Sequence, residues 1–249
     1  MINRRCIRVF LTFLMIAVGV SASSSMAQTA LSTENRALLV NPEKSKTINN
    51  SSDPLSRFAD LRRHQNKGQY SATLALVELT DYQCHFCKRH HQKVFPKIKE
   101  KYIDSGILKY QVWQFPLAGQ LTPQATSVRA SQAAACAEQQ EMFWPMHHAL
   151  FKASQQLSEE PYIELASQLG LAEDTFTACM AGEIPLSVIY DVSYGRQLGA
   201  SGTPHFLVGW IKDNRLLGAR LMRGAKSFES FDAMIKMLQQ EVLRQQPQE

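Results

Sequence analysis

Four stretches of the chain have the hydrophobic pattern of buried or half-buried strands. Residues 72–79 (ATLALVEL) are apolar at nearly every position, which is typical of a strand covered on both faces. Apolar and polar residues alternate over residues 108–112, which predicts a second strand. Residues 206–208 predict a third strand, and residues 218–224 predict its partner, joined through a turn at Asp213–Asn214.

Most of the sequence between and after these strands has apolar residues at helical spacing. Residues 84–103 carry apolar side chains three and four positions apart, so they predict a helix that Pro96 kinks and Gly106 ends. Strand, helix and strand in this close succession form a βαβ unit. A last apolar stripe predicts a closing helix, with Phe228, Phe231, Ile235, Leu238 and Val242 on one face.

Residues 117–199 have a different character and predict a block of helices. Thr122 followed by Pro123 is a good helix start, because threonine caps a first turn and proline fits within it. An alanine-rich helical segment follows them. The block separates the βαβ unit from the second pair of strands, so we interpret it as an insert.

The first 27 residues have the three parts of a secretory signal peptide. Arg4, Arg5 and Arg8 precede an apolar run over residues 9–20, and small residues end the segment at Ala27. We therefore expect export and cleavage near Ala27. The alternative is an uncleaved anchor, although the apolar run is short for a membrane span.

Residues 28–70 are polar and lack periodicity, which predicts a mobile leader with one short helix near residues 54–64.

Composition limits the functional prediction in two ways. The formal charge is +5, and it falls to +2 without the three arginines of the signal, so no nucleic-acid partner is expected. Four cysteines remain after the signal, which suggests two pairs in an oxidising compartment.

The candidate catalytic residues are Cys84 and Cys87, which lie in the stretch LTDYQCHFCKRHH. A CxxC pair beside a βαβ pattern is typical of a thioredoxin-like redox site. Cys84 falls at the start of the predicted helix, where unpaired backbone N–H groups and the helix dipole favour a thiolate. Cys87 lies one turn later, where its sulfur can reach that of Cys84. The pattern predicts a dithiol that cycles with a disulfide.

A zinc site is the competing hypothesis for this stretch. It would use Cys84 and Cys87 with two of His85, His90 and His91. Structural zinc sites usually take their ligands from two separate loops, whereas all of these residues belong to one helix start. Histidines at such positions are more often exposed helix residues than ligands. We therefore expect no bound metal.

Thr203–Pro204, in GASGTPHFLVG, stands directly before a predicted strand. Proline interrupts the hydrogen bonding of a central strand, so it fits only at the strand's start, where a cis bond is one option. An ordinary turn proline is the other option, and these residues alone favour it.

Together the signal-like start, VELTDYQCHFCKRHH, CAEQQEMFWPMHHALF and LGASGTPHFLVG resemble the DsbA family of exported thiol–disulfide oxidoreductases. The resemblance covers about residues 72–242. It implies an α/β, thioredoxin-like fold with an inserted helical domain. Residues 71–116 and 200–245 would form the thioredoxin-like domain, and residues 117–199 the insert.

The resemblance also implies roles for supporting residues. Thr203 and a cis Pro204 would pack against the two sulfurs and hold the backbone of a bound substrate. An acid six residues before the first cysteine would exchange a proton with Cys87, and Glu78 has that position. An edge-facing Glu78 is the alternative. The dipeptide between the cysteines, His85–Phe86, departs from the proline-first pattern of many family members, so the strength of the oxidant stays open.

Cys136 and Cys179 both lie in the predicted insert, and no CxxC spacing links them. We therefore expect a structural disulfide between them and no catalytic role.

The resulting functional prediction is a periplasmic oxidase that introduces disulfides into exported proteins with free thiols. It needs no cofactor of its own, and a membrane quinone-linked partner would reoxidise it. Two alternatives stay open: a disulfide isomerase or reductase kept in the reduced form, and a peptide-binding chaperone that does not turn over.

Overall fold

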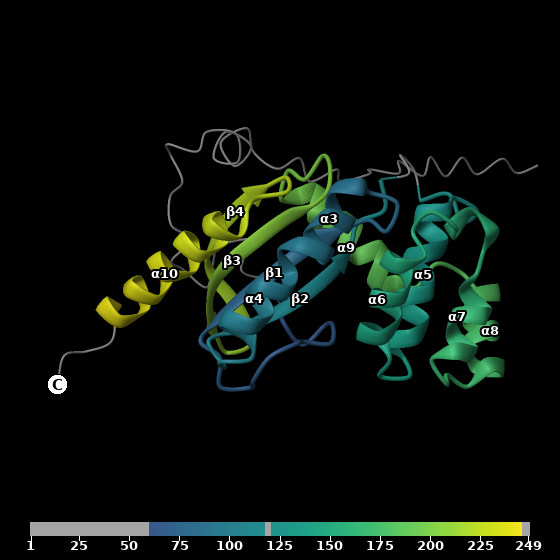
Figure 1. Ribbon diagram of the computed structural model, residues 1–249, viewed down its shortest axis with the longest axis horizontal. Coiled ribbons are helices and arrows are strands. Elements are labelled where there is room, and N and C mark those ends of the chain that lie inside the picture. Colours follow the sequence, from purple (N-terminus) through teal and green to yellow (C-terminus); the bar gives the residue numbers. More distant parts are fainter. Residues whose placement is uncertain (1–59, 118–120, 246–249) are drawn as a thin grey trace, which may run out of the picture.

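The computed structural model describes residues 60–117 and 121–245 (Figure 1). Its described part contains a four-stranded mixed sheet in the order β2-β1-β3-β4. The strands are β1 (Leu74–Thr80), β2 (Leu108–Gln114), β3 (His205–Lys212) and β4 (Arg215–Arg223). Strand β1 runs parallel to β2 and antiparallel to β3, so the predicted βαβ unit is confirmed.

Both faces of the sheet are covered. All seven residues of β1 and all seven of β2 are buried, including the polar Lys109 and Gln111 of β2. On one face Leu74 and Leu76 pack into a core shared with helices α3 (His85–Lys93), α4 (Phe95–Ile98) and α10 (Phe228–Gln245). On the other face Val77 packs with residues of α9 (Leu186–Gln197) and with the segment that precedes β1. The strand that carries Glu78 is therefore the central, fully buried one.

The helix after β1 is interrupted, and this corrects the prediction of one helix kinked at Pro96. Helix α3 (His85–Lys93) ends before α4 (Phe95–Ile98), which continues as a π-helical turn, η2 (Lys99–Ile103). Pro96 lies in the first turn of α4. Because proline has no N–H and its ring displaces the carbonyl four residues back, it is tolerated at a helix start and breaks a helix interior.

Strands β3 and β4 form a hairpin, as the sequence predicts. Asp213 and Asn214 form its turn with positive φ angles of 51° and 57°, which match the right-handed twist of the flanking strands. Helix α10 (Phe228–Gln245) follows and buries one apolar stripe against the sheet, through Phe231, Ile235 and Leu238.

The described part of residues 117–199 contains helices and no strand. They are α5 (Thr126–Glu138), α6 (Phe143–Lys152), the 3-10 turn η3 (Leu157–Glu159), α7 (Tyr162–Gln168), α8 (Glu173–Ala181) and α9 (Leu186–Gln197). In Figure 1, α5 to α8 lie together beyond one end of the sheet. That this block is a separate domain stays a prediction.

Helix α5 begins three residues later than predicted, with its N-cap at Ala125 in place of Thr122. The Thr122 carbonyl accepts a hydrogen bond from the Ala125 N–H at 2.9 Å, which closes a turn, and the helix begins at Thr126.

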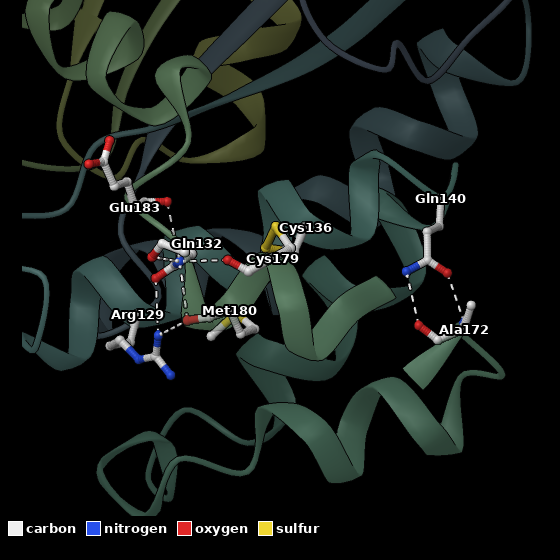
Figure 2. Close-up of a disulfide and its surroundings, with 9 residues drawn as sticks. Arg129, Gln132, Cys136, Gln140, Ala172, Cys179, Met180 and Glu183 are labelled. Carbon is white, nitrogen blue, oxygen red and sulfur yellow. Dashed lines mark hydrogen bonds between the residues drawn. A yellow bond between two sulfur atoms is a disulfide. The ribbon is translucent and has the colours of Figure 1, made fainter. Parts of the chain in front are cut away.

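Cys136 and Cys179 are joined in a disulfide that links α5 to α8 (Figure 2). Beside it, the Gln132 side-chain amide donates to the Cys179 carbonyl at 3.0 Å, and the Arg129 guanidinium donates to the Met180 carbonyl at 2.6 Å. These bonds add to the capping of α8, where the Cys179 carbonyl also accepts the backbone N–H of Gly182 at 3.2 Å.

The segment before β1 corrects the prediction of a mobile leader over its described part. Residues 60–70 contain turns and isolated bridges, with no helix. Leu61 and His64 are buried, and the Lys67 N–H donates to the Tyr110 carbonyl at 2.8 Å. The predicted signal peptide and the rest of the leader lie outside the described residues.

None of the described helices is long and apolar enough to cross a membrane.

Candidate active site

Cys84 stands at the N-cap of α3, as the sequence predicts. Its φ of −75° and ψ of 117° are extended, and its carbonyl accepts the first helical hydrogen bond, from the Lys88 N–H at 3.0 Å. The preceding turn is held by Asp81, whose carboxylate accepts the N–H of Gln83 at 2.7 Å and that of Leu117 at 2.8 Å. Asp81 is a positioning residue that the sequence analysis missed.

The position of Cys84 favours its thiolate. A hydrogen bond from the Cys87 thiol, the Thr203 side chain and the backbone N–H groups of Cys87 and Phe86 together lower the pKa of Cys84 to about 5, against a smaller opposing effect of burial. A large fraction of Cys84 is therefore a nucleophile at neutral pH.

Cys87 has the opposite environment. It is fully buried on α3, and burial together with the hydrogen bond that it donates to Cys84 and the nearby Glu78 carboxylate raises its pKa well above the ordinary thiol value. Both cysteines are unbonded, so the structure shows the dithiol form. At neutral pH the partly exposed Cys84 therefore loses its proton readily, whereas the buried Cys87 keeps its own.

Thr203–Pro204 is a cis peptide beside this pair. The Cys84 thiol donates to the Thr203 carbonyl at 3.4 Å. The Thr203 hydroxyl is buried and has no hydrogen-bond partner among the described residues in the thiol form. A hydroxyl donor favours a thiolate over a thiol, and the Thr203 side chain accordingly lowers the pKa of Cys84.

Glu78 is buried on the central strand, so the edge-facing alternative is excluded. Its exposed fraction is 2%. The Oε2 atom accepts a hydrogen bond from the Tyr110 hydroxyl at 2.6 Å, and Oε1 accepts one from the Thr80 hydroxyl at 3.0 Å. Burial raises the pKa of Glu78 to about 7, and these two hydrogen bonds oppose the rise. Glu78 can therefore lose or take a proton near neutral pH.

A pocket of 350 Å³ opens beside the cysteines. It is lined by Phe86, Arg89, Ser201, Gly202, Thr203, Pro204, His205, Gly224 and Ala225. The exposed Phe86 ring lies under the Arg89 guanidinium at 5.1 Å. His85 is exposed and its ring lies beside that of Phe86, at 5.8 Å between centroids. Phe86 therefore lines the pocket, and His85 lies beside Phe86.

The ligands of the zinc hypothesis do not converge. Among the described residues, no three His, Cys, Asp or Glu side chains are placed to hold one metal ion. The His90 ring faces Tyr110, with Nε2 at 3.0 Å from the hydroxyl, and the His91 Nε2 lies 3.1 Å from Nδ1 of His148.

The interpretation of His90 as an exposed helix residue was wrong, since it is 1% exposed. It is three residues beyond Cys87 on α3 and shares the buried face of that helix. That spacing was the available signal in the sequence. The sequence contained no such signal for Tyr110, because only the register that pairs Leu76 with Tyr110 places Tyr110 on the same face of the sheet as Glu78.

A family model described as thioredoxin matches residues 63–237. Among curated proteins, disulfide bond formation protein D of Bacillus subtilis is 27% identical over 114 residues, which cover 43% of this chain and 47% of that protein. The Na(+)/H(+) antiporter NhaA 3 of Salinispora tropica is 28% identical over 150 residues, covering 60% of this chain and 22% of the antiporter. The chain thus spans about half or less of the length of these curated relatives.

Two solved structures have the same fold. Alpha-DsbA1 of Wolbachia pipientis has a TM-score of 0.59 and 26% identity, covering 72% of this chain and 92% of that one. Oxidised BdbD of Bacillus subtilis has a TM-score of 0.61 and 19% identity, covering 72% and 94%. The expected thioredoxin-like α/β fold is confirmed.

Proposed function

Because this chain belongs to the thioredoxin family, as a DsbA-like protein, we propose that it oxidises thiols of exported proteins through Cys84 and Cys87. The observation that carries the proposal is the asymmetry of the pair. The pKa of Cys84 is lowered to about 5 at the N-cap of α3, while that of the buried Cys87 is raised. A stabilised thiolate favours the reduced enzyme, so the disulfide is a strong oxidant.

Exchange begins when a substrate thiolate attacks the Cys84 sulfur of the oxidised enzyme. The Cys84–Cys87 bond breaks, a mixed disulfide forms at Cys84, and Cys87 leaves as a thiolate that takes a proton. A second substrate thiolate then attacks the substrate sulfur of the mixed disulfide and releases the Cys84 thiolate. The substrate loses two electrons and two protons; the enzyme gains both electrons, and one proton ends on Cys87 while the other goes to solvent.

The pocket beside Cys84 is where the substrate chain would lie. The Pro204 loop supplies backbone groups next to the Cys84 sulfur, and Phe86 supplies an exposed apolar surface. Backbone pairing with an extended segment would give affinity without a sequence requirement. This suits an enzyme that accepts many unfolded substrates.

Export to the periplasm is part of the proposal and is supported by the signal-like residues 1–27. The reduced enzyme must be reoxidised to turn over, and a membrane quinone-linked protein is the proposed acceptor of its electrons. The name of the Bacillus subtilis relative, disulfide bond formation protein D, supports the same direction of exchange.

The deciding experiment is the equilibrium of the Cys84–Cys87 pair with reduced and oxidised glutathione. We expect a reduction potential above about −200 mV, in the range of oxidants and isomerases, whereas thioredoxin-type reductases lie near about −270 mV. A value in the reductase range would contradict the oxidase. Complete lack of exchange would favour the chaperone alternative.

Serine variants test the division of roles. We expect Cys84→Ser to abolish exchange, because the buried Cys87 is inaccessible to substrates. We expect Cys87→Ser to accumulate mixed disulfides at Cys84, because no second thiol remains to release the substrate. Non-reducing mass mapping after each variant is mixed with the disulfide form of a cysteine peptide measures both results, because attack on that disulfide releases one peptide thiolate; adducts on Cys87 in Cys84→Ser would reverse the assignment.

A further inference from the structure

Three buried side chains from three elements form a hydrogen-bond chain next to the cysteines. Glu78 of β1 accepts from the Tyr110 hydroxyl of β2 at 2.6 Å, and the Tyr110 oxygen lies 3.0 Å from Nε2 of His90 on α3. The three residues are between 0% and 2% exposed. Helix α3 also carries Cys87, and after burial and the hydrogen bond to Cys84 the charge of Glu78 further raises the pKa of its thiol.

The direction of donation along this hydrogen-bond chain follows from the number of hydrogens that each group carries. The Tyr110 hydroxyl has one hydrogen and donates it to Glu78, so its oxygen must accept from His90. His90 then carries its hydrogen on Nε2. Its Nδ1 has no hydrogen-bond partner among the described residues, and the rings of Phe206 and Phe231 lie 4.6 and 5.4 Å from its own.

The other tautomer would place an N–H donor at that apolar position with nothing to accept it, which costs more than an unpaired acceptor. A charged His90 is excluded by the same surroundings, since burial lowers its pKa to about 3. The donors therefore point one way, from His90 to Tyr110 to Glu78.

The two oxygens of Glu78 are thereby made different. Oε2 always faces a donor, so it is held as an acceptor. Oε1 faces the Thr80 hydroxyl, which donates to a carboxylate and can rotate to accept from a carboxylic acid. Oε1 is the oxygen that can carry a proton without breaking the chain.

Resting on the proposed exchange function, we propose that Tyr110 and His90 are positioning residues for proton transfer between Cys87 and Glu78. When the Cys84–Cys87 bond breaks, the Cys87 thiolate takes the proton from Oε1 of Glu78, which becomes a carboxylate. When a mixed disulfide at Cys84 is resolved, Glu78 takes the proton from the Cys87 thiol. The thiolate formed attacks the Cys84 sulfur and expels the substrate thiolate. One proton passes between two buried groups, so both need not be charged at once.

The test is the pH profile of the resolving step. Reduced enzyme is mixed with oxidised glutathione, quenched with acid at intervals from pH 5 to 9, and analysed by mass spectrometry. The rate of interest is the conversion of the Cys84–glutathione adduct to the Cys84–Cys87 disulfide. For the wild type we expect an inflection near pH 7, where Glu78 becomes a base.

Tyr110→Phe removes only the hydroxyl. The Glu78 carboxylate loses a donor, so we expect the inflection to move up by about one pH unit, which is a tenfold change in the base fraction. His90→Leu should move it in the same direction by less, and His90→Gln, which keeps an N–H donor near the Nε2 position, should restore it. The His90 pair keeps the test valid if Tyr110→Phe does not fold.

Two controls separate this role from a structural one. Tyr102→Phe removes a hydroxyl that also bonds a carboxylate, that of Asp232 on α10, and should leave the profile unchanged. In Glu78→Gln the inflection should vanish, and adding Tyr110→Phe should then produce no shift. A Tyr110→Phe profile that overlays the wild type, or a shift that persists in Glu78→Gln, overturns the inference. A wild type that forms no glutathione adduct overturns the proposed function instead.

Discussion

The thiols of Cys84 and Cys87 differ strongly in proton affinity because the two residues occupy different positions at the start of α3. Cys84 stands at the N-cap, where the backbone N–H groups of Phe86 and Cys87 favour its thiolate and help to lower its pKa. Cys87, inside the helix, has no such donors and faces the buried Glu78. The proposed roles of nucleophile and resolving thiol thus follow from position on one helix, because the two residues are of the same type.

The titration of Cys84 is the direct check at this scale. The rate of Cys84 alkylation by iodoacetamide should follow an inflection near pH 5, because only the thiolate reacts. The same reaction in denaturant should titrate near pH 8.5, the value of a free thiol. Thr203→Val should raise the native inflection, since it removes the hydroxyl donor. A native inflection near pH 8.5 would contradict the site geometry.

At the scale of elements, the helical block is held together by a covalent bond and against the sheet by close packing. The disulfide joins α5 to α8 across a sequence separation of 43 residues. Helix α9 approaches β2 closely at Gly195, where a Cβ atom would lie 2.4 Å from the Phe115 ring and 2.7 Å from Leu79. Only glycine allows that approach.

Removal of the disulfide should destabilise the protein without abolishing exchange. A chain-entropy argument for a loop of this length gives a loss of at most about 4 kcal/mol in Cys136→Ala/Cys179→Ala. Urea unfolding measures the loss, and glutathione exchange at Cys84 should continue in the folded variant. Equal unfolding free energies for variant and wild type would show that the bond contributes nothing to stability.

Gly195→Ala should also be destabilising, although alanine is the better helix former. Overpacking costs about 1–3 kcal/mol, which exceeds the gain of about 1 kcal/mol in helix propensity. Ser193→Ala, at an exposed position of the same helix, is the matched control and should change the unfolding free energy little. A stabilised Gly195→Ala would mean that α9 can move away from the sheet without cost.

At the scale of the whole molecule, a buried charge network ties the helical block to the sheet. His64 lies between two carboxylates, with Nδ1 at 3.1 Å from Glu138 of α5 and Nε2 at 2.9 Å from Asp191 of α9. Asp191 also accepts the backbone N–H of Gln114 on β2 at 2.8 Å. Because both ring nitrogens face carboxylate oxygens, both carry hydrogen and His64 is charged.

This network predicts a loss of stability in alkali. Burial lowers the pKa of His64, but Asp191 and Glu138 outweigh it and raise the pKa to about 9, above the unfolded value near 6.5. A raised pKa gives a contribution that is complete below pH 6.5 and lost as pH rises through 9, amounting to about 3 kcal/mol. The difference in unfolding free energy between wild type and His64→Gln should therefore shrink over this range. A difference independent of pH would show that His64 is neutral.

Local chemistry made much of the fold and site predictable. The apolar run at residues 72–79, the turn at Asp213–Asn214 and the CxxC pair each depend on neighbours within a few positions. The predictions were wrong where contacts with residues distant in the sequence determine which side chains are buried. Residues 60–70 read as polar leader because the partners of His64 are more than 70 positions away. His90 read as exposed because Phe206 and Phe231, which cover it, belong to β3 and α10.

By itself, the sequence determined the order of strands and helices and the position of Cys84 at a helix start, since periodicity and spacing act over one or two turns, while the family resemblance pointed to the acid at residue 78. Tertiary structure alone decided which side chains share a buried space. The parallel register of β1 and β2 sets Tyr110 against Glu78, and the packing of α3 on that face adds His90. Strand register and helix packing depend on the sum of many distant contacts, so no local pattern reveals them.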